Sequence, residues 1–236
     1  MLIKTQKYYY DFKGDYCMRK ENEVSLKKGL EEVFQIALPE LSFDQAIPSV
    51  SEVLSWKEYQ DRRIVINETV TENFMFYSQL IVQWNKEDYD NGIKAESRKP
   101  IKIFLYTYGG SVDAAKSFYN LMQISKTPIH IYNMGVCASA GVLIFLSGHK
   151  RYAIKGSTFL IHEGELGLGG QTTKVIENLE TIKKQEKEIE EYIVSKTNID
   201  KKMYTKNKKK EWWISTEAKE LGLVDDFIED MEEVFM

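Results

Sequence analysis

The chain has 236 residues, and 32 Lys and Arg against 36 Asp and Glu give a formal net charge of −4 at pH 7. Hydrophobic residues make up 43% and charged residues 29%, a balance typical of globular proteins that excludes disorder of the whole chain. This charge gives no general attraction to nucleic acid. The longest continuous apolar run, residues 140–146, is far shorter than the roughly 20 residues that span a membrane.

Targeting and metal signals are also missing from the sequence. Residues 1–15 lack the apolar core of a signal peptide because Lys and Asp interrupt them, so we expect a cytoplasmic protein. Cys17 and Cys137 have neither metal-ligand spacing nor the pattern of a disulfide framework. We therefore expect no metal, no other cofactor, and no nucleic-acid or membrane partner.

The first 48 residues differ from the rest. Aromatic residues cluster between residues 8 and 16, and apolar residues then recur at helical spacing until Pro39: Leu26, Leu30, Val33, Phe34 and Ala37. This pattern predicts a helical N-terminal extension over residues 1–48, with a linker around residues 39–48. Residues 49–236 would form the main domain.

From residue 62 onward, short β-rich runs alternate with helical patterns. The predicted strands are residues 64–66, 101–107, 129–132 and 159–161, and the predicted helices are residues 71–84, 111–124 and 140–146. Such alternation indicates βαβ units, and therefore an α/β fold with a largely parallel sheet packed against helices.

A longer helix is predicted over residues 171–196. Its apolar stripe is interrupted at Glu186 and consists of Val175, Leu179, Ile182, Ile189 and Ile193. Two interpretations remain open, a surface helix packing on its own domain and a projecting helix packing on a second subunit. The lysine-rich stretch over residues 201–210 is interpreted as a solvated face or a flexible loop.

Small residues surround one serine in the segment over residues 134–141, directly after a predicted strand. Gly135 and Gly141 allow sharp turns, and Ser139 would lie at the start of a helix, where unpaired N–H groups favour negative charge. This placement suits a serine nucleophile or an anion site, although small residues at such turns also serve packing. A G-x-S-x-G spacing is absent, so the elbow of α/β-hydrolases is not predicted.

A nucleophilic serine needs a base, and the chain has three histidines. His130 begins a predicted strand, and His149 lies in a polar turn. His162 ends the apolar run over residues 159–161 and precedes a glycine-rich stretch, where a side chain can reach a cleft. We therefore choose His162 as the candidate base.

Gly109 and Gly110 also follow a predicted strand and open a helix. Paired glycines let the backbone approach a substrate closely and can present N–H groups to an oxyanion. A phosphate-binding turn and a plain tight connection remain alternatives. The dinucleotide-binding fingerprint and the P-loop are both absent.

In this order, the segments over residues 109–112, 134–141, 160–162 and 217–225 resemble the Clp protease proteolytic subunit family, ClpP, over about two thirds of the chain. The resemblance implies the ClpP/crotonase superhelix of βαβ units, with residues 171–196 as a projecting handle helix between two rings. It also implies Ser139 as nucleophile and His162 as general base. The backbone N–H groups of Gly110 and Ala140 would form the oxyanion hole.

The third member of the triad departs from the family pattern, which has an aspartate near this position. Aligning on Trp213-Ile214-Ser215 brings Glu211 there, whereas aligning on residues 222–225 without a gap brings Lys210. We favour Glu211 because a carboxylate accepts the imidazole N–H and stabilises the imidazolium. Asp200 is the alternative carboxylate, and Glu211 could instead offset its neighbouring lysines.

The resemblance implies a serine endopeptidase that cleaves unfolded polypeptides inside a homo-oligomer of stacked heptameric rings. Any ATP-driven unfolding would come from a separate AAA+ partner, because the chain has no P-loop. The alternatives are a catalytically silent ring or scaffold subunit, a crotonase-type acyl-CoA enzyme, and a phage-type maturation protease. The N-terminal 48 residues do not match the family.

Overall fold

The computed structural model describes residues 9–10, 16–17, 50–165, 167 and 169–234. The chain divides into two units, residues 1–51 and 52–236, which we take one at a time. In the first, the short strands β1 (Tyr9–Tyr10) and β2 (Tyr16–Cys17) pair antiparallel. The predicted helix over residues 26–37 and the linker over residues 39–48 lie outside the described residues, so the helical extension stays a prediction.

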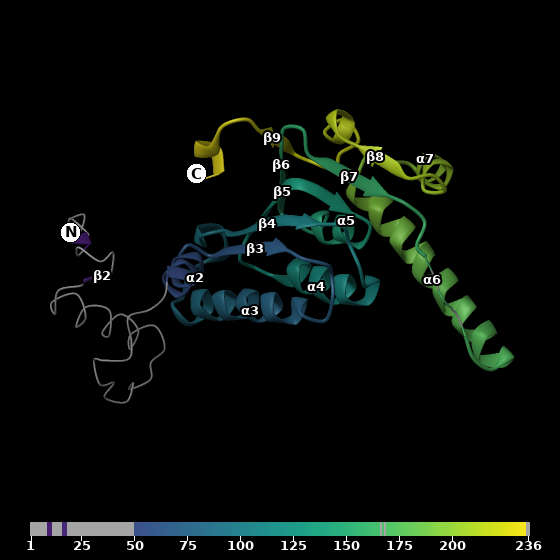
Figure 1. Ribbon diagram of the computed structural model, residues 1–236, viewed down its shortest axis with the longest axis horizontal. Helices are drawn as coiled ribbons and strands as arrows, with labels where there is room; N and C mark the ends of the chain where they lie inside the picture. The colour runs from purple at the N-terminus through teal and green to yellow at the C-terminus, as the bar shows by residue number, and fades with distance from the viewer. Residues whose placement is uncertain (1–8, 11–15, 18–49, 166, 168, 235–236) are drawn as a thin grey trace. The chain divides into compact units, whose positions relative to one another are not determined.

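The second unit is built on a mostly parallel sheet (Figure 1). Five parallel strands are neighbours in the order β3 (Arg63–Asn67), β4 (Ile101–Thr107), β5 (Ile129–Ala138), β6 (Lys150–Ile154) and β9 (Asp226–Ile228). Strand β7 (Thr158–Ile161) pairs parallel with β5, and β8 (Trp212–Ile214) pairs antiparallel with β7. The structure therefore confirms the predicted α/β class.

Helices bury one face of this sheet. In β4, alternate side chains are fully buried, and Ile101, Ile103 and Leu105 each have 0% exposure. Helices α3 (Phe74–Asp90) and α4 (Val112–Ile124) run along this face (Figure 1). Each such buried side chain contributes about 1.5–3 kcal/mol, so the strand edges that carry the site rest on a rigid core.

Several predicted boundaries are wrong. The helix predicted over residues 71–84 begins at Phe74, after a turn in which the Phe74 N–H donates to Thr71 O, and continues to Asp90. The strand predicted over residues 129–132 continues to Ala138, so residues 134–138 are strand and not turn. Additional elements were not predicted at all: α2 (Val50–Gln60), η2 (Ala95–Ser97), β6, α7 (Lys201–Asn207), β8, η3 (Thr216–Ala218), β9 and η4 (Met231–Val234).

Strand β5 changes its partner halfway along its length. Residues 130–133 pair with β6, whereas residues 136–138 pair with β7. Asn133 is fully buried at the change: its Nδ2 donates to Thr158 O at 3.0 Å, and its Oδ1 accepts from the Gly135 N–H at 3.0 Å. Ser157 Oγ also donates to Asn133 O at 3.0 Å. Asn133 therefore fixes the start of β7 against the end of β5.

Helix α6 (Thr172–Lys196) extends away from the sheet at its N-terminal end (Figure 1). Near its C-terminal end, Ile193 is 3% exposed and packs in the main core, whereas Ile176 and Leu179 are 55% and 40% exposed. The C-terminal part of the helix therefore packs on its own domain, whereas packing of the projecting part on a second subunit stays a prediction. In the part of the chain that the structure describes, no helix is long and apolar enough to cross a membrane.

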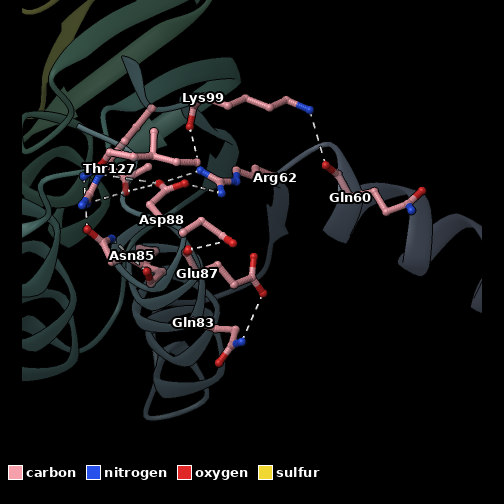
Figure 2. A network of polar contacts seen from close by, with 12 residues as sticks. Gln60, Arg62, Gln83, Asn85, Glu87, Asp88, Lys99 and Thr127 are labelled. Atoms are coloured by element: carbon pink, nitrogen blue, oxygen red, sulfur yellow. Dashed lines mark hydrogen bonds and ion pairs between the residues drawn. The ribbon is translucent and has the colours of Figure 1, made fainter. Parts of the chain in front are cut away.

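A buried ion pair ties helix α3 to the start of the sheet (Figure 2). Asp88 is 1% exposed, and its two carboxylate oxygens accept from the Arg62 guanidinium at 2.7 and 2.8 Å. Thr127 Oγ1 donates to the same carboxylate at 2.7 Å. Burial alone would raise the pKa of Asp88, but hydrogen bonds from Arg62 and Thr127 outweigh it and lower the pKa below its ordinary value.

Candidate active site

Ser139 lies in a strained turn between strand β5 and helix α5 (Ala140–Phe145). Its φ of 55° and ψ of −126° lie in a region that non-glycine residues rarely adopt, at a cost of about 1–3 kcal/mol. Such strain occurs mainly at functional sites. The absence of G-x-S-x-G therefore did not exclude a sharp turn that carries a serine at the end of a strand.

Gly109 packs directly against this turn, and the adjacent Gly110 packs against Val70. A β-carbon on Gly109 would lie 2.7 Å from Ser139 Cβ, and one on Gly110 would lie 2.4 Å from Val70 O. Both glycines have φ in the left-handed range, 93° and 147°. Only glycine fits this close approach, which places the Gly109-Gly110 backbone beside the serine.

The backbone N–H groups of Gly110 and Ala140 belong to the two segments that meet at Ser139. Val70 bonds to the residues on either side of Gly110, because the Val70 N–H donates to Gly109 O at 2.9 Å and the Ser111 N–H to Val70 O at 2.8 Å. Within the described residues, neither the Gly110 N–H nor the Ala140 N–H donates a hydrogen bond. The predicted oxyanion donors are thus both available.

Thr107 supports the glycine loop and was not singled out from the sequence. It is 2% exposed, its Oγ1 donates to Glu68 O at 2.7 Å, and the same oxygen accepts from the Gly109 N–H at 3.1 Å. Its methyl group also faces Gly141, where a β-carbon would lie 2.5 Å away. A threonine ending a predicted strand before Gly-Gly is the only signal that could have indicated it.

The strand pairing brings His162 to the same edge of the sheet as Ser139. In the parallel ladder Ala138 pairs with Leu160, and the Ser139 N–H donates to Leu160 O at 2.9 Å. His162 directly follows the last residue of β7. Ser139 and His162 therefore follow the ends of two paired strands. The backbones of such neighbouring strands lie about 4.8 Å apart.

The side chain of His162 is partly exposed, and within the described residues it makes no hydrogen bond or ion pair. The other two histidines lie at the opposite end of the sheet. His130 begins β5 and packs edge-on against Tyr152, and burial lowers its pKa. His149 precedes β6, and its Nδ1 accepts from the Ile129 N–H at 3.1 Å. Of the three, His162 alone is near Ser139.

Glu211 lies directly before strand β8, and His162 lies directly after strand β7. In the antiparallel ladder Leu160 pairs with Trp213 and Ile161 with Trp212, and the ladder ends at that second pair. Beyond it the Glu163 N–H donates to Lys208 O at 2.8 Å, so residues 209–211 lie opposite His162 without a regular register. Trp213 Nε1 donates to Glu211 Oε2 at 3.5 Å.

Asp200, the alternative carboxylate, caps helix α7. Its Oδ1 accepts from the Met203 N–H at 2.7 Å, a contact of the kind that N-cap residues make. Lys210, the product of the other alignment, lies in the turn before Glu211, where its N–H donates to Asn207 O at 3.0 Å. Glu211 thus directly precedes the strand that pairs with β7, whereas the carboxylate of Asp200 is used in a cap.

Cys137, two residues before Ser139, is unsuited to act as a nucleophile. Its thiol is fully buried, and this burial raises its pKa well above the ordinary value for cysteine. Among the described residues, no group of three or more His, Cys, Asp or Glu could hold a metal ion.

A mostly parallel sheet of βαβ units, with a strained serine after the end of one strand and a histidine after the end of the next, defines a ClpP-like protein. Comparison with known families agrees. The family model described as Clp protease matches residues 55–231, and this chain belongs to that family.

Curated relatives are proteolytic subunits of this family. ATP-dependent Clp protease proteolytic subunit 2 of Treponema pallidum is 30% identical over 134 residues, which cover 56% of this chain and 67% of that protein. Subunit 3 of Streptomyces avermitilis is 28% identical over 174 residues, covering 70% and 78%. A solved structure, a point mutant of ClpP1 from Listeria monocytogenes, superposes with a TM-score of 0.59 at 22% identity and covers 76% of this chain and 98% of that one. This last likeness shows the fold.

Proposed function

We propose that this chain is a serine endopeptidase that cleaves unfolded polypeptides by acyl transfer inside an oligomeric chamber. The observation that carries the proposal is the strained turn at Ser139, next to strand β7, which His162 directly follows. His162 takes the proton from Ser139 Oγ, and the oxygen attacks the scissile carbonyl. The N–H groups of Gly110 and Ala140 bind the oxyanion, and His162 gives the proton to the leaving amine as the peptide C–N bond breaks. Water, deprotonated by His162, then hydrolyses the acyl-enzyme ester and returns the proton to Ser139.

Glu211 is our candidate for the third catalytic residue. Its place directly before β8, whose first residue pairs with the residue before His162, favours it over Asp200, whose carboxylate caps α7. A carboxylate there accepts the imidazole N–H, selects the tautomer and stabilises the imidazolium during acyl transfer.

The assembly, partners and compartment follow from the family as proposals. The exposed apolar residues Ile176 and Leu179 on α6 suit a helix that packs against a second copy, as in stacked heptameric rings. A separate AAA+ unfoldase would deliver substrates, and the cytoplasm is the proposed location. Light scattering tests the assembly, and a monomer at micromolar concentration would refute it.

A fluorophosphonate probe tests the chemistry directly. We expect the probe to modify Ser139, located by peptide mass spectrometry, and we expect Ser139→Ala to abolish both labelling and peptide cleavage. Cys137→Ala is the matched control, because it removes the neighbouring thiol and should leave labelling intact. Cleavage that persists in Ser139→Ala would refute the proposal.

A catalytically silent ring or scaffold subunit is the second candidate. It is favoured by one observation, that the His162 side chain makes no hydrogen bond or ion pair within the described residues. Wild-type protein that forms rings yet neither reacts with the probe nor cleaves peptides would support this candidate. Membership of the Clp protease family selects the peptidase over the crotonase-type acyl-CoA enzyme as the activity to be tested.

A further inference from the structure

An irregular stretch of backbone follows the β7–β8 ladder and contains both His162 and Glu211. The last ladder pair is Ile161 with Trp212, and beyond it the Glu163 N–H donates to Lys208 O at 2.8 Å. Between these two contacts, the segment after β7 contains only His162, whereas the segment before β8 contains residues 209–211. The contact at Lys208 therefore closes a short loop around the candidate base and its candidate carboxylate.

The side chain of Lys208 joins this loop to the long helix α6. Its Nζ lies 2.9 Å from Glu186 Oε2 and 3.9 Å from Glu163 Oε1, and the side chain is only 12% exposed. The ammonium also lies over the ring of Tyr204, 5.4 Å from its centroid, and Tyr204 is 2% exposed. Partial burial strengthens these contacts relative to exposed pairs.

Glu186 is the residue that interrupts the apolar stripe of α6. Its side chain is 32% exposed and pairs with Lys208, and a β-carbon on Gly164 would lie 3.4 Å from its Oε1. The chain that leaves His162 thus passes directly beside this carboxylate. The break in the stripe thus coincides with a carboxylate that pairs with Lys208.

We infer that Lys208 is a positioning residue, which fixes His162 and Glu211 in place by anchoring the loop that contains them to Glu186 of α6. This inference rests on the proposed function. Strand β7 has only four residues, so its ladder leaves the segment beyond Ile161 unsupported. A misplacement of about 1 Å in such a site costs on the order of 100-fold in rate.

Lys208→Met tests the inference because it keeps the aliphatic stem over Tyr204 and removes the charge. We expect kcat for a short peptide to fall about 10- to 100-fold with little change in KM, and Lys208→Arg to restore most of the loss. Lys201→Met is the matched control. Lys201 also pairs with α6, through Glu190 at 2.8 Å, but it is 71% exposed and forms no ion pair with the loop within the described residues.

Glu186→Gln removes the same ion pair from the helix side and keeps the test valid if Lys208→Met folds poorly. It should also lower kcat, without lowering the melting temperature more than Lys201→Met does. Either a wild-type kcat in Lys208→Met or Glu186→Gln, or an equal loss in Lys201→Met, would overturn the inference.

Hydrogen exchange separates this inference from the proposed function. The Glu163 N–H, which donates to Lys208 O, should exchange faster in Lys208→Met than in wild type or Lys201→Met, whether or not the protein is active. Faster exchange together with a wild-type protein inert to the probe would support the anchor and refute the peptidase. An active wild type with unchanged exchange and kcat in Lys208→Met would refute the anchor alone.

Discussion

Gly110→Ala tests whether the close approach of the glycine loop serves catalysis. The added β-carbon would lie 2.4 Å from Val70 O and 2.9 Å from Thr69 Cγ2, whereas ordinary contact begins at 3.4 Å. The loop must therefore shift by about 1 Å, enough to cost on the order of 100-fold in rate. Complete loss of one oxyanion donor costs about 100- to 1,000-fold in kcat. We expect a fall in kcat of that size, measured with a fluorogenic peptide.

Gly156→Ala is the control for backbone strain. Gly156 also has a left-handed φ, 90°, but a β-carbon there would have no atom within 4 Å. Both variants pay the strain of alanine in this region, about 1–3 kcal/mol, and thermal unfolding should register it in both. Only Gly110→Ala should lose kcat. Activity within about threefold of wild type in Gly110→Ala, well short of the loss expected for an oxyanion donor, or an equal loss in Gly156→Ala, would refute the assignment.

Three further substitutions have defined outcomes. Glu211→Gln should lower kcat by at least about 10-fold at nearly constant KM, while Asp200→Asn, which exchanges one good N-cap for another, should retain it; the reverse result would reassign the third residue. Asn133→Ala leaves two buried backbone groups unpaired, at about 1–3 kcal/mol each, and urea unfolding should show that loss. Asp88→Asn leaves Arg62 without its buried partner and should cost about 3–5 kcal/mol at pH 7. Because the folded-state pKa of Asp88 is lowered, its contribution is complete above the ordinary carboxyl pKa and is lost as pH falls through the folded value. The difference between wild type and Asp88→Asn should therefore shrink in acid, and a constant difference would contradict the assignment.

The βαβ alternation was predictable because each strand and helix carries its own hydrophobic period. Strand β4 illustrates this, since every second residue from Ile101 to Thr107 is buried. The end of β5 was not predictable, because Gly135, Cys137 and Ala138 have little intrinsic preference for strand. They are extended because Asn133 and strand β7 hold them there. That pairing depends on residues 25 positions apart along the chain.

The candidate site, like the fold, has parts that could be predicted from the sequence and parts that could not. The turn at Ser139 and the loop at Gly109-Gly110 could be found from small residues after predicted strands, because close backbone approach requires them. The place of Glu211 could be stated only as one of two alignments. The pairing of β7 with β8 supports Glu211 as a candidate, but it was not readable from the sequence, because β8 is a three-residue strand whose sequence Trp-Trp-Ile gives no alternating pattern.

Ser139 and His162 are held in place by different parts of the structure. Ser139 follows a strand bonded on both sides and precedes a fully buried helix, so its position is determined by the core. His162 follows a four-residue strand, and its surroundings depend on a half-exposed loop and one ion pair to α6. Substitutions at Lys208 or Glu211 should therefore reduce activity with little loss of fold stability. Substitutions in the core beneath Ser139, in contrast, should lower activity and fold stability together. This difference in stability would show that the core positions the serine, whereas contacts outside the core position the histidine.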